Sequence, residues 1–259
     1  MKRQTRFRTI LALLDERERV NVEDLAAHFD VSPETIRRDL STMSEQGLLR
    51  KVYGGAVKFQ SAQENSFALR TKQYADQKMV IAQYAVRFVQ PGDSLFVNAG
   101  TTTAIFAREL VKYVDHLIII TNSPQIAHAF WNNGQSENAI YLLGGDYNGA
   151  ETETLGTTVV DQIQRFHADH AFLTVGTLNA VQGFMDYRII TAEINRTMAK
   201  QAQRTTVLID SSKLDQMALI TTCSIHEIDR LVTDSSPSDT LTTALKKAGT
   251  QLHIAEIGR

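Results

Sequence analysis

The sequence predicts an α/β protein of two parts: a small helical domain at the N-terminus and a larger domain built on a parallel sheet. Two observations support this. Apolar residues within 1–58 recur at helical spacing, whereas within 76–259 short apolar runs alternate with helical patterns. A polar, non-periodic segment, 59–75, lies between them, and we expect it to be a linker. The 259 residues are enough for both domains.

The composition excludes several classes of protein. Apolar residues make up 43% and charged residues 22%, as in ordinary globular proteins. The single cysteine, Cys223, excludes an intramolecular disulfide and a multi-cysteine zinc site, and we expect a buried, inert thiol. Met1-Lys2-Arg3 does not begin a signal peptide, and no apolar run has the length of a membrane span. We therefore expect a cytoplasmic protein with no membrane partner.

The net charge of -2 averages over two unlike parts. Residues 1–58 hold 11 Lys+Arg against 9 Asp+Glu, and the remainder holds 16 against 20. The basic excess lies at the N-terminus, but it is too small to indicate a nucleic-acid partner by itself.

Residues 32–43 predict a short helix with one apolar and one basic face. Ser32 is a suitable N-cap, and Pro33 suits the first helical position. The apolar stripe falls at positions i, i+4 and i+7: Ile36, Leu40 and Met43. The opposite face carries Glu34, Arg37, Arg38, Ser41 and Thr42. Such a helix fits a DNA major groove, and taken alone it fits a solvated surface helix equally well.

Two helices are predicted before this one. Helical spacing of Phe7 and the leucines after it indicates a helix over 6–15. Asn21 can cap a second helix with Leu25 and Phe29 as its core residues. A short turn at 30–31 then leads to the Ser32 helix, which is the helix-turn-helix arrangement.

A small hairpin is predicted after the third helix. Gly47 is the expected C-cap of the third helix. Residues 48–57 then read as two short strands joined by a turn at Gly54-Gly55. Its strands carry Arg50 and Lys51, which could reach phosphates. The hairpin would be the wing of a winged helix-turn-helix.

The segment from Arg6 through Leu40 closely resembles the helix-turn-helix of DeoR-family bacterial transcription regulators. The match includes Ser32-Pro33-x-Thr35-Ile36-Arg37-Arg38-Asp39-Leu40, then Gly47 and Gly54-Gly55-Ala56. The resemblance implies a double-stranded DNA operator as partner.

Chemistry assigns roles to these residues. We expect Arg37 and Arg38 to contact guanine edges or phosphates. Asp39 flanks the polar face and could orient an arginine instead of meeting DNA, and Arg3, Arg6 and Arg8 are either backbone contacts or solvated side chains. The expected DNA-binding residues are Ser32, Pro33, Thr35, Arg37, Arg38, Ser41, Thr42, Arg50 and Lys51.

Strand and helix patterns alternate through the rest of the chain. After an amphipathic segment at 76–89, the predicted strands are 94–98, 117–121, 139–143, 170–175, 206–209, 230–232 and 251–254. The predicted helices are 102–113, 124–132, 157–165, 189–203 and 238–248. This order predicts a parallel sheet with helices on both faces.

Ligands of such sheets bind beyond the carboxyl ends of the strands. The turns there are rich in Gly, Ser, Thr, Asn and Asp: 98–103, 121–123, 144–146, 176–179 with 183–186, and 210–213. Gly100, Thr101 and Thr102 open a helix and could bind an anion, although a tight turn with threonine capping explains them equally well. No Walker motif and no dinucleotide fingerprint is present. With Lys213, these turns could form a phosphate cradle.

The order of these turns resembles the C-terminal sensor domain of the DeoR family, which is related in fold to ribose-5-phosphate isomerase and glucosamine-6-phosphate deaminase. The resemblance implies a repressor of a carbohydrate-utilisation operon, released by a phosphorylated sugar or sugar-acid effector. The implied effector site is Gly100, Thr101 and Thr102 for the phosphate, with Asn122, Gly144, Gly145, Gly176, Asp186, Glu193 and Lys213 around the rest. Gly144-Gly145 could instead only turn the chain, and Glu193 could be an exposed helix carboxylate.

The sequence departs from better-known relatives near Asn148, where many carry an arginine and this chain has none. Tyr187-Arg188 follows Asp186 instead. The effector could therefore carry a different polar tail, or Arg188 could replace the missing cation.

Two alternatives to a regulator remain open. In an isomerase-like or deaminase-like enzyme, Asp186 and Glu193 would be base and acid. In a metal-dependent sensor the histidines would bind a metal, but their spacing is poor: His116, His128, His167, His170 and His226. Because fold does not imply function, we expect no catalytic residue, no cofactor and no metal. We expect a homodimer or homotetramer, since operators present two half-sites.

Overall fold

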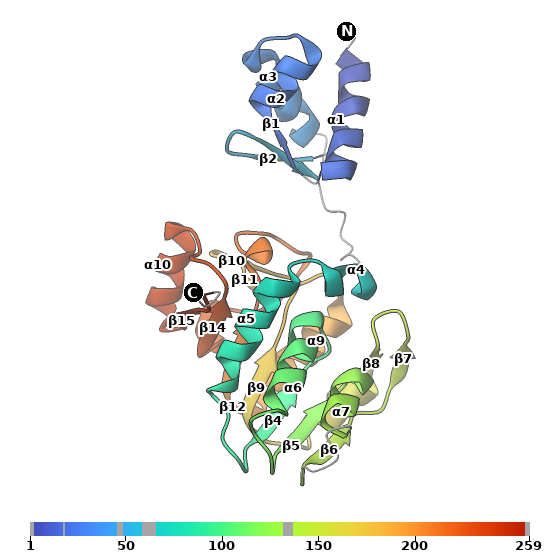
Figure 1. The fold of residues 1–259 in the computed structure, drawn as a ribbon, viewed down its shortest axis with the longest axis vertical. Coiled ribbons are helices and arrows are strands. Elements are labelled where there is room, and N and C mark those ends of the chain that lie inside the picture. Colours follow the sequence, from blue (N-terminus) through green and yellow to red (C-terminus); the bar gives the residue numbers. More distant parts are fainter. Residues whose placement is uncertain (1–2, 18, 46–48, 59–65, 132–136, 257–259) are drawn as a thin grey trace. The chain divides into compact units, whose positions relative to one another are not determined.

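The computed structural model describes residues 3–17, 19–45, 49–58, 66–131 and 137–256 (Figure 1). The chain divides into two compact units, Met1–Gln63 and Glu64–Arg259. The expected C-cap Gly47 and residues 59–65 of the expected linker lie outside the described residues, as do the side chains of Arg8 and Arg50.

The smaller unit is a winged helix-turn-helix. Its order is α1 (Arg3–Arg17), β1 (Arg19–Asn21), α2 (Val22–Phe29), α3 (Pro33–Glu45), β2 (Leu49–Val52) and β3 (Gly55–Lys58). The three helices and the hairpin confirm the prediction. Strand β1 was not predicted, because three residues are too few to show a period of two. It adds to the hairpin and gives an antiparallel sheet of order β1-β3-β2.

One hydrophobic core holds this unit together. The predicted stripe is fully buried, with Ile36, Leu40 and Met43 each 0% exposed. It packs with Ile10, Leu14, Leu25 and Phe29 of the other two helices. At the turn, Gly54 has φ +77°. Gly55 is needed for a different reason: a Cβ there would lie 2.0 Å from the carbonyl oxygen of Val20 in β1.

The larger unit is built on a seven-stranded parallel sheet of order β15-β14-β12-β9-β4-β5-β6. The strands are β4 (Ser94–Val97), β5 (Ile118–Thr121), β6 (Ala139–Leu142), β9 (Ala168–Leu173), β12 (Ala202–Leu208), β14 (Arg230–Thr233) and β15 (Gln251–Ile254). The predicted parallel sheet is confirmed. The prediction was wrong at 202–203, expected in a helix, because Ala202 already pairs with Ala168 of β9.

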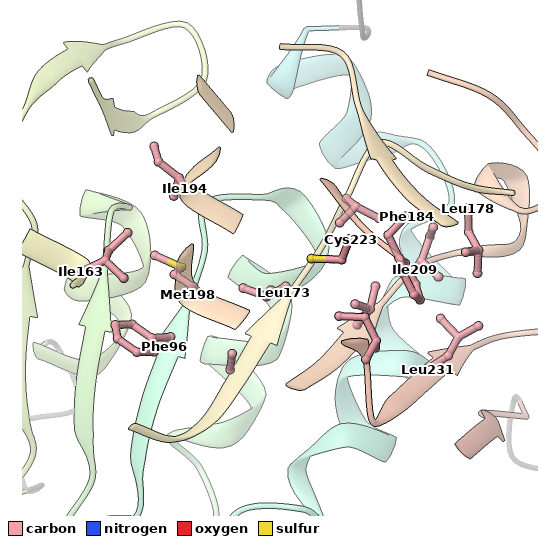
Figure 2. Close-up of a cluster of buried hydrophobic side chains, with 14 of the residues drawn as sticks. Phe96, Ile163, Leu173, Leu178, Phe184, Ile194, Met198, Ile209, Cys223 and Leu231 are labelled. Carbon is pink, nitrogen blue, oxygen red and sulfur yellow. The ribbon is translucent and has the colours of Figure 1, made fainter. Parts of the chain in front are cut away.

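Helices cover both faces of this sheet. They are α4 (Phe67–Lys72), α5 (Ala75–Val86), α6 (Thr101–Leu110), α7 (Pro124–Trp131), α8 (Thr157–Ile163), α9 (Ile189–Lys200) and α10 (Asp239–Ala248). Helices α5, α6 and α7 share a core with residues such as Phe172 and Leu208. Helices α8, α9 and α10 share the opposite core, in which Phe96 and Leu173 lie close to Ile163 and Met198 (Figure 2).

Short strands that the sequence did not predict lie at the carboxyl end of the sheet. They are β7 (Asp146–Asn148), β8 (Glu153–Leu155), β10 (Thr177–Asn179), β11 (Gly183–Asp186) and β13 (Ile220–Cys223). Strands β7 and β8 form a hairpin, and β10-β11-β13 form a second small antiparallel sheet. Figure 1 shows α4, which lies within the expected linker, at the same end of the unit as these strands. No described helix has the length and hydropathy needed to cross a bilayer.

Candidate functional site

The exposed start of α3 is fixed by Ser32. Its Oγ accepts a hydrogen bond from the backbone N–H of Thr35 at 3.2 Å and lies 2.9 Å from Thr35 Oγ1. Pro33 is the first residue of the helix. The expected helix start is therefore confirmed. It presents two hydroxyl groups at the N-terminus of α3, which is the end of the recognition helix that contacts base edges in helix-turn-helix proteins.

Arg37 and Arg38 are the exposed cations of α3. Their side chains are 56% and 80% exposed, and both lie near Glu34, at 3.4 and 3.7 Å. Exposed ion pairs of this kind contribute little stability, roughly 0–1 kcal/mol. The two guanidinium groups can therefore exchange Glu34 for base edges or phosphates at small cost.

Further along α3, strand β2 and helix α1 bring cations to the same polar face. Lys51 of β2 donates from Nζ to Ser41 Oγ at 2.8 Å. Arg3 of α1 donates from Nη2 to Thr42 Oγ1 at 2.6 Å. The hydroxyls of Ser41 and Thr42 also donate to backbone carbonyls one turn earlier. The structure thus gathers Arg3, Lys51 and the α3 arginines on one face.

Asp39 is a buried structural residue. It is 3% exposed and accepts hydrogen bonds from Arg3 Nε at 3.0 Å and Arg6 Nε at 2.8 Å. Arg6 is 8% exposed and ion-pairs with Asp39 through Nη2 at 2.6 Å. Asp39 therefore orients arginines, as the sequence predicted, and Arg6 ties α1 to α3 instead of being solvated.

Sequence reasoning missed Tyr53. It occupies the turn of the wing between β2 and β3 and is 100% exposed. An aromatic residue inside a predicted hairpin reads as core, so only the structure distinguishes it as a surface group. Its ring and hydroxyl add a contact point at the tip of the wing.

At the carboxyl edge of the larger sheet, Asn98 joins the ends of β4 and β9. Its Nδ2 donates to the carbonyl of Thr174 at 2.8 Å and to Asn195 Oδ1 at 2.7 Å, while its Oδ1 accepts from the N–H of Thr174 at 2.9 Å. Thr103 Oγ1 donates to the Asn98 carbonyl at 2.8 Å. Asn98 is 2% exposed, so this network fixes the strand ends from within.

The predicted residues Gly100, Thr101 and Thr102 form the turn from β4 into α6. A Cβ at Gly100 would lie 2.1 Å from Thr174 Cγ2, so this position requires glycine. Thr101 and Thr102 are 4% and 1% exposed. The first-turn N–H groups of a helix have no intrahelical acceptor, so the start of α6 retains the donors that an oxyanion needs.

Asn122 lies beside this turn. Its Oδ1 accepts from the N–H of Ala99 at 2.9 Å, and its Nδ2 donates to the carbonyl of Thr154 at 3.0 Å. Asn122 therefore links β5, the α6 turn and β8.

Gly145 also lies against β8, since a Cβ there would be 2.3 Å from the carbonyl oxygen of Leu155. Gly144 is exposed and hydrogen-bonds with Gln162 through its N–H and carbonyl.

Asp186 organises the turn after β9. Its Oδ1 accepts from the N–H of Gly176 at 2.9 Å, and its Oδ2 accepts from Asn195 Nδ2 at 3.0 Å and Thr222 Oγ1 at 2.7 Å. It is 4% exposed. Because both carboxylate oxygens accept hydrogen bonds from the protein, Asp186 is a buried residue that fixes the turn at the carboxyl edge of the sheet.

Glu193 and Lys213 complete the predicted set. Glu193 ion-pairs with Arg196 on the same helix, and its side chain is 46% exposed. This agrees with the alternative that Glu193 is an exposed helix carboxylate. Lys213 donates from Nζ to the carbonyl of Val175 at 3.0 Å, which brings it to the end of β9. The structure thus gathers Lys213 with the β9 turn and leaves Glu193 on the surface of α9.

Arg188 and Asn148 meet at one carboxylate. Arg188 Nη1 and Asn148 Nδ2 donate to the same oxygen of Glu153, Oε1, at 2.8 and 3.3 Å. The Glu153 side chain is 7% exposed and that of Arg188 is 45% exposed. Burial raises the pKa of Glu153, and the Arg188 guanidinium opposes that rise. Arg188 therefore lies beside Asn148, with Glu153 between the two side chains.

Two observations concern residues that could bind a metal or react with one another in the part of the chain that the structure covers. No group of three His, Cys, Asp or Glu residues there is arranged to hold a metal ion. Cys223, the lone thiol, is buried as predicted.

A winged helix-turn-helix joined to a larger α/β domain is an arrangement typical of a DNA-binding regulator. Comparison with known proteins agrees. A model of the DeoR-like helix-turn-helix domain matches residues 6–62, and a model of the DeoR C-terminal sensor domain matches residues 73–235. The chain belongs to the DeoR family and is a DNA-binding transcriptional repressor.

Individual relatives extend along almost the whole chain. A putative aga operon transcriptional repressor of Escherichia coli O157:H7 is 31% identical over 252 residues, 94% of this chain and 90% of that protein. The glycerol-3-phosphate regulon repressor of Haemophilus influenzae is 29% identical over 252 residues, 97% of each. A solved ribose 5-phosphate isomerase A of Methanocaldococcus jannaschii is 19% identical, with a TM-score of 0.40 over 55% of each chain.

Proposed function

We propose that this repressor controls a carbohydrate-utilisation operon and leaves its operator when a phosphorylated sugar or sugar acid binds the carboxyl edge of the larger sheet. One observation carries the proposal most directly. The start of α6, with Thr101 and Thr102, is connected to strand β8 through hydrogen bonds of Asn122 to Ala99 and Thr154. Strand β8 contains Glu153, whose carboxylate accepts a hydrogen bond from Arg188. An anion-binding helix start and a cation thus share one edge.

The similar proteins support the chemistry of this effector. The glycerol-3-phosphate regulon repressor, 29% identical over 97% of this chain, is named for a phosphorylated three-carbon compound. The proposed contacts are the α6 turn and Lys213 for the phosphate, and Asn122, Gly144, Gly145, Gly176 and Arg188 around the remainder. Asp186 supports them from below.

The first experiment is a thermal-shift screen of phosphorylated sugars and sugar acids, each beside its unphosphorylated partner. A ligand that binds only the folded state adds about 2.7 kcal/mol at a hundredfold excess over Kd. We expect one phosphorylated compound to raise Tm, and Thr101→Ala and Lys213→Ala to abolish that rise. Matched controls are Thr157→Ala, at the exposed start of α8, and Lys247→Ala, exposed on α10. A rise caused only by unphosphorylated compounds would refute the phosphate site.

We further propose that the larger domain senses its ligand without transforming it. Asp186, the alternative general base, has both oxygens engaged by Gly176, Asn195 and Thr222. Glu193, the alternative acid, pairs with Arg196. Incubation with the identified effector should yield no isomer or deaminated product, and turnover that Asp186→Asn abolishes would show an enzyme instead.

Release from DNA requires two arrangements of the protein. We propose a homodimer or homotetramer in the cytoplasm that presents two α3 helices to half-sites about one helical turn apart or a multiple of it. The effector would favour an arrangement with the wrong spacing, which takes a coupling free energy of about 1–3 kcal/mol. Saturating effector should weaken operator binding accordingly, and unchanged operator affinity with bound effector would refute the coupling.

A further inference from the structure

A second group of cations lies at the opposite, amino end of the larger sheet. Arg204 of β12 and Arg230 of β14 are near neighbours on adjacent strands, since Thr206 pairs with Arg230. Arg204 in turn pairs with His170 of β9. Alternate residues of a strand share a face, so His170, Arg204 and Arg230 all lie on the face that α5 covers.

The end of α5 completes the group with aromatic rings and another arginine. The Arg230 guanidinium lies over the ring of Phe88 at 4.7 Å, and that of Arg87 lies over the ring of Tyr84 at 3.8 Å. His253 of β15 lies between them, with its ring centroid 5.0 Å from that of Phe88. We call Arg87, Arg204, Arg230 and His253 the amino-edge cluster.

The nearby carboxylates do not neutralise this cluster. Asp229 accepts from the N–H of Thr205, and Asp169 accepts from the N–H and hydroxyl of Ser94. Asp93 lies 3.6 Å from His170. Among the described residues, no carboxylate comes within ion-pair distance of Arg87, Arg204 or Arg230. Three guanidinium groups and an imidazole thus lie near one another, and the charge of Asp229 acts on Arg230 without forming an ion pair with it.

Several polar atoms of this region have no hydrogen-bond partner within the described part of the protein. Arg230 Nη1, His253 Nε2 and His170 Nδ1 are all buried and unpartnered, and so is the hydroxyl of Thr206. A buried polar group without a partner costs about 1–3 kcal/mol, more when charged. Burial, and after it the charge of the neighbouring arginines, also lowers the pKa values of Arg230 and His253. The cluster is therefore short of acceptors and of negative charge.

We propose that the amino-edge cluster binds an oxyanion of the phosphate class, at a site separate from the effector edge. A tetrahedral oxyanion supplies the missing negative charge, and its oxygens can accept from guanidinium groups in the paired geometry that arginine favours. Arg204 is exposed and Arg230 is partly exposed, so an anion enters from the Arg204 side. The aromatic rings of Tyr84 and Phe88 hold the flanking arginines in place.

The position of the site suggests what it does. The cluster joins α5 to β12, β14 and β15, which the structure otherwise holds through apolar contacts on that face. An anion there would stabilise this half of the sheet whether or not the effector edge is filled. The phosphate could be free or part of a larger metabolite.

The test is binding of inorganic phosphate and sulfate to the full chain, measured by isothermal titration and by thermal shift. We expect both anions to bind the wild type, and Arg230→Gln and Arg204→Gln to weaken binding at least tenfold. Arg108→Gln, an exposed arginine of α6, is the matched control and should bind like the wild type. Lys213→Ala and Thr101→Ala should lose only the phosphate that binds at the proposed effector site and should keep the binding that Arg230→Gln removes, which separates the two sites.

Three outcomes would overturn the proposal. The first is no binding of either anion; the second is binding that Arg230→Gln leaves unchanged. The third is self-association of the wild type that Arg230→Gln abolishes without any anion, which would assign the cluster to an acidic face of a second copy. If binding is confirmed, titration with phosphorylated and unphosphorylated forms of one metabolite distinguishes free phosphate from a phosphorylated compound. Folding of the glutamine variants is checked by their circular dichroism.

Discussion

Arg188 donates a hydrogen bond of 2.8 Å to the buried carboxylate of Glu153. Burial is the larger influence on this carboxylate, so its pKa lies above the usual value of 4.5 despite the arginine. The folded protein therefore binds this proton more tightly than the unfolded chain does.

This shift predicts how stability depends on pH. As pH rises from about the unfolded pKa of Glu153 through its higher folded pKa, the folded state loses a proton that the unfolded state has already lost, so the free energy of unfolding falls. Glu153→Gln should remove this contribution, and Arg188→Ala should enlarge it. Urea unfolding between pH 4 and 8 measures the difference from the wild type. Glu137→Gln, whose side chain is 83% exposed, is the control; a wild-type-like profile for Glu153→Gln would contradict the assignment.

Arg37 should contribute to operator recognition and not to folding. Within the described part of the chain its guanidinium pairs with the exposed Glu34 at 3.4 Å, so Arg37→Ala should change the free energy of unfolding by less than about 1 kcal/mol. If it contacts a guanine, the variant should lose roughly 1–3 kcal/mol of operator affinity and relax specificity at one base pair. Binding to a library of operator variants measures both. Arg17→Ala on α1 is the control, and an equal loss on every sequence would make Arg37 a phosphate contact.

Asp39 should be essential for the stability of the small unit. Removing it leaves Arg6, whose side chain is 10% exposed, without the carboxylate that it ion-pairs with. Breaking a buried pair from one side costs roughly 3–5 kcal/mol, a large part of the stability of so small a domain. Asp39→Ala should therefore lose operator binding and lower the unfolding midpoint of this unit. Asp24→Ala, exposed in the first turn of α2, should cost less than about 1 kcal/mol. Equal effects of the two substitutions would show that the Asp39 pairs are unimportant.

Cys223 should be unreactive in the folded protein. It is 3% exposed, and burial raises its pKa to about 12, so almost no thiolate is present at pH 8. Iodoacetamide should label the protein in urea but not in buffer, as mass spectrometry can measure. A Ser235→Cys variant supplies an exposed thiol as the control, and rapid labelling of native wild type would show that Cys223 is accessible.

Periodicity predicted the elements whose burial is regular. The stripe Ile36, Leu40 and Met43 repeats with the helical period, because only one side of α3 faces the core. The central strands were predicted because parallel strands buried on both faces read as continuous apolar runs, such as 118–121.

The distant partners of the predicted site residues could not be predicted. Asp186 follows a segment of Gly, Thr and Asn that reads as a turn, and its partner Thr222 is 36 positions away. The same holds for Glu153 and Arg188, which are separated by 35 positions. Local patterns identify polar strand ends, but only the packed structure shows which of their side chains support the edge and which remain accessible.

The contact between Arg70 and Glu151 suggests how a ligand at the carboxyl edge would affect the DNA-binding unit. Arg70 lies on α4, the helix within the expected linker, and ion-pairs with Glu151 beside β8. The Arg70 side chain is 12% exposed. Buried Lys78 donates to the carbonyl of Gln73 at 2.8 Å and so holds the end of α4. Tyr74 and Thr152, adjacent to these contacts, have backbone φ angles of 54° and 51°, which residues other than glycine rarely adopt.

Glu151→Gln should therefore weaken the response to effector more than the binding of effector. Strand β8 carries Thr154 and Glu153, which contact Asn122 and Arg188, so a ligand there acts on the same hairpin that holds α4. We expect effector affinity within a few-fold of the wild type and at least half of the coupling free energy, about 1–3 kcal/mol in total, to be lost. Operator affinity with and without saturating effector measures this, with Glu137→Gln as the control. A full response in Glu151→Gln would rule out this contact as the connection, whereas no response in the wild type would instead refute release by the effector.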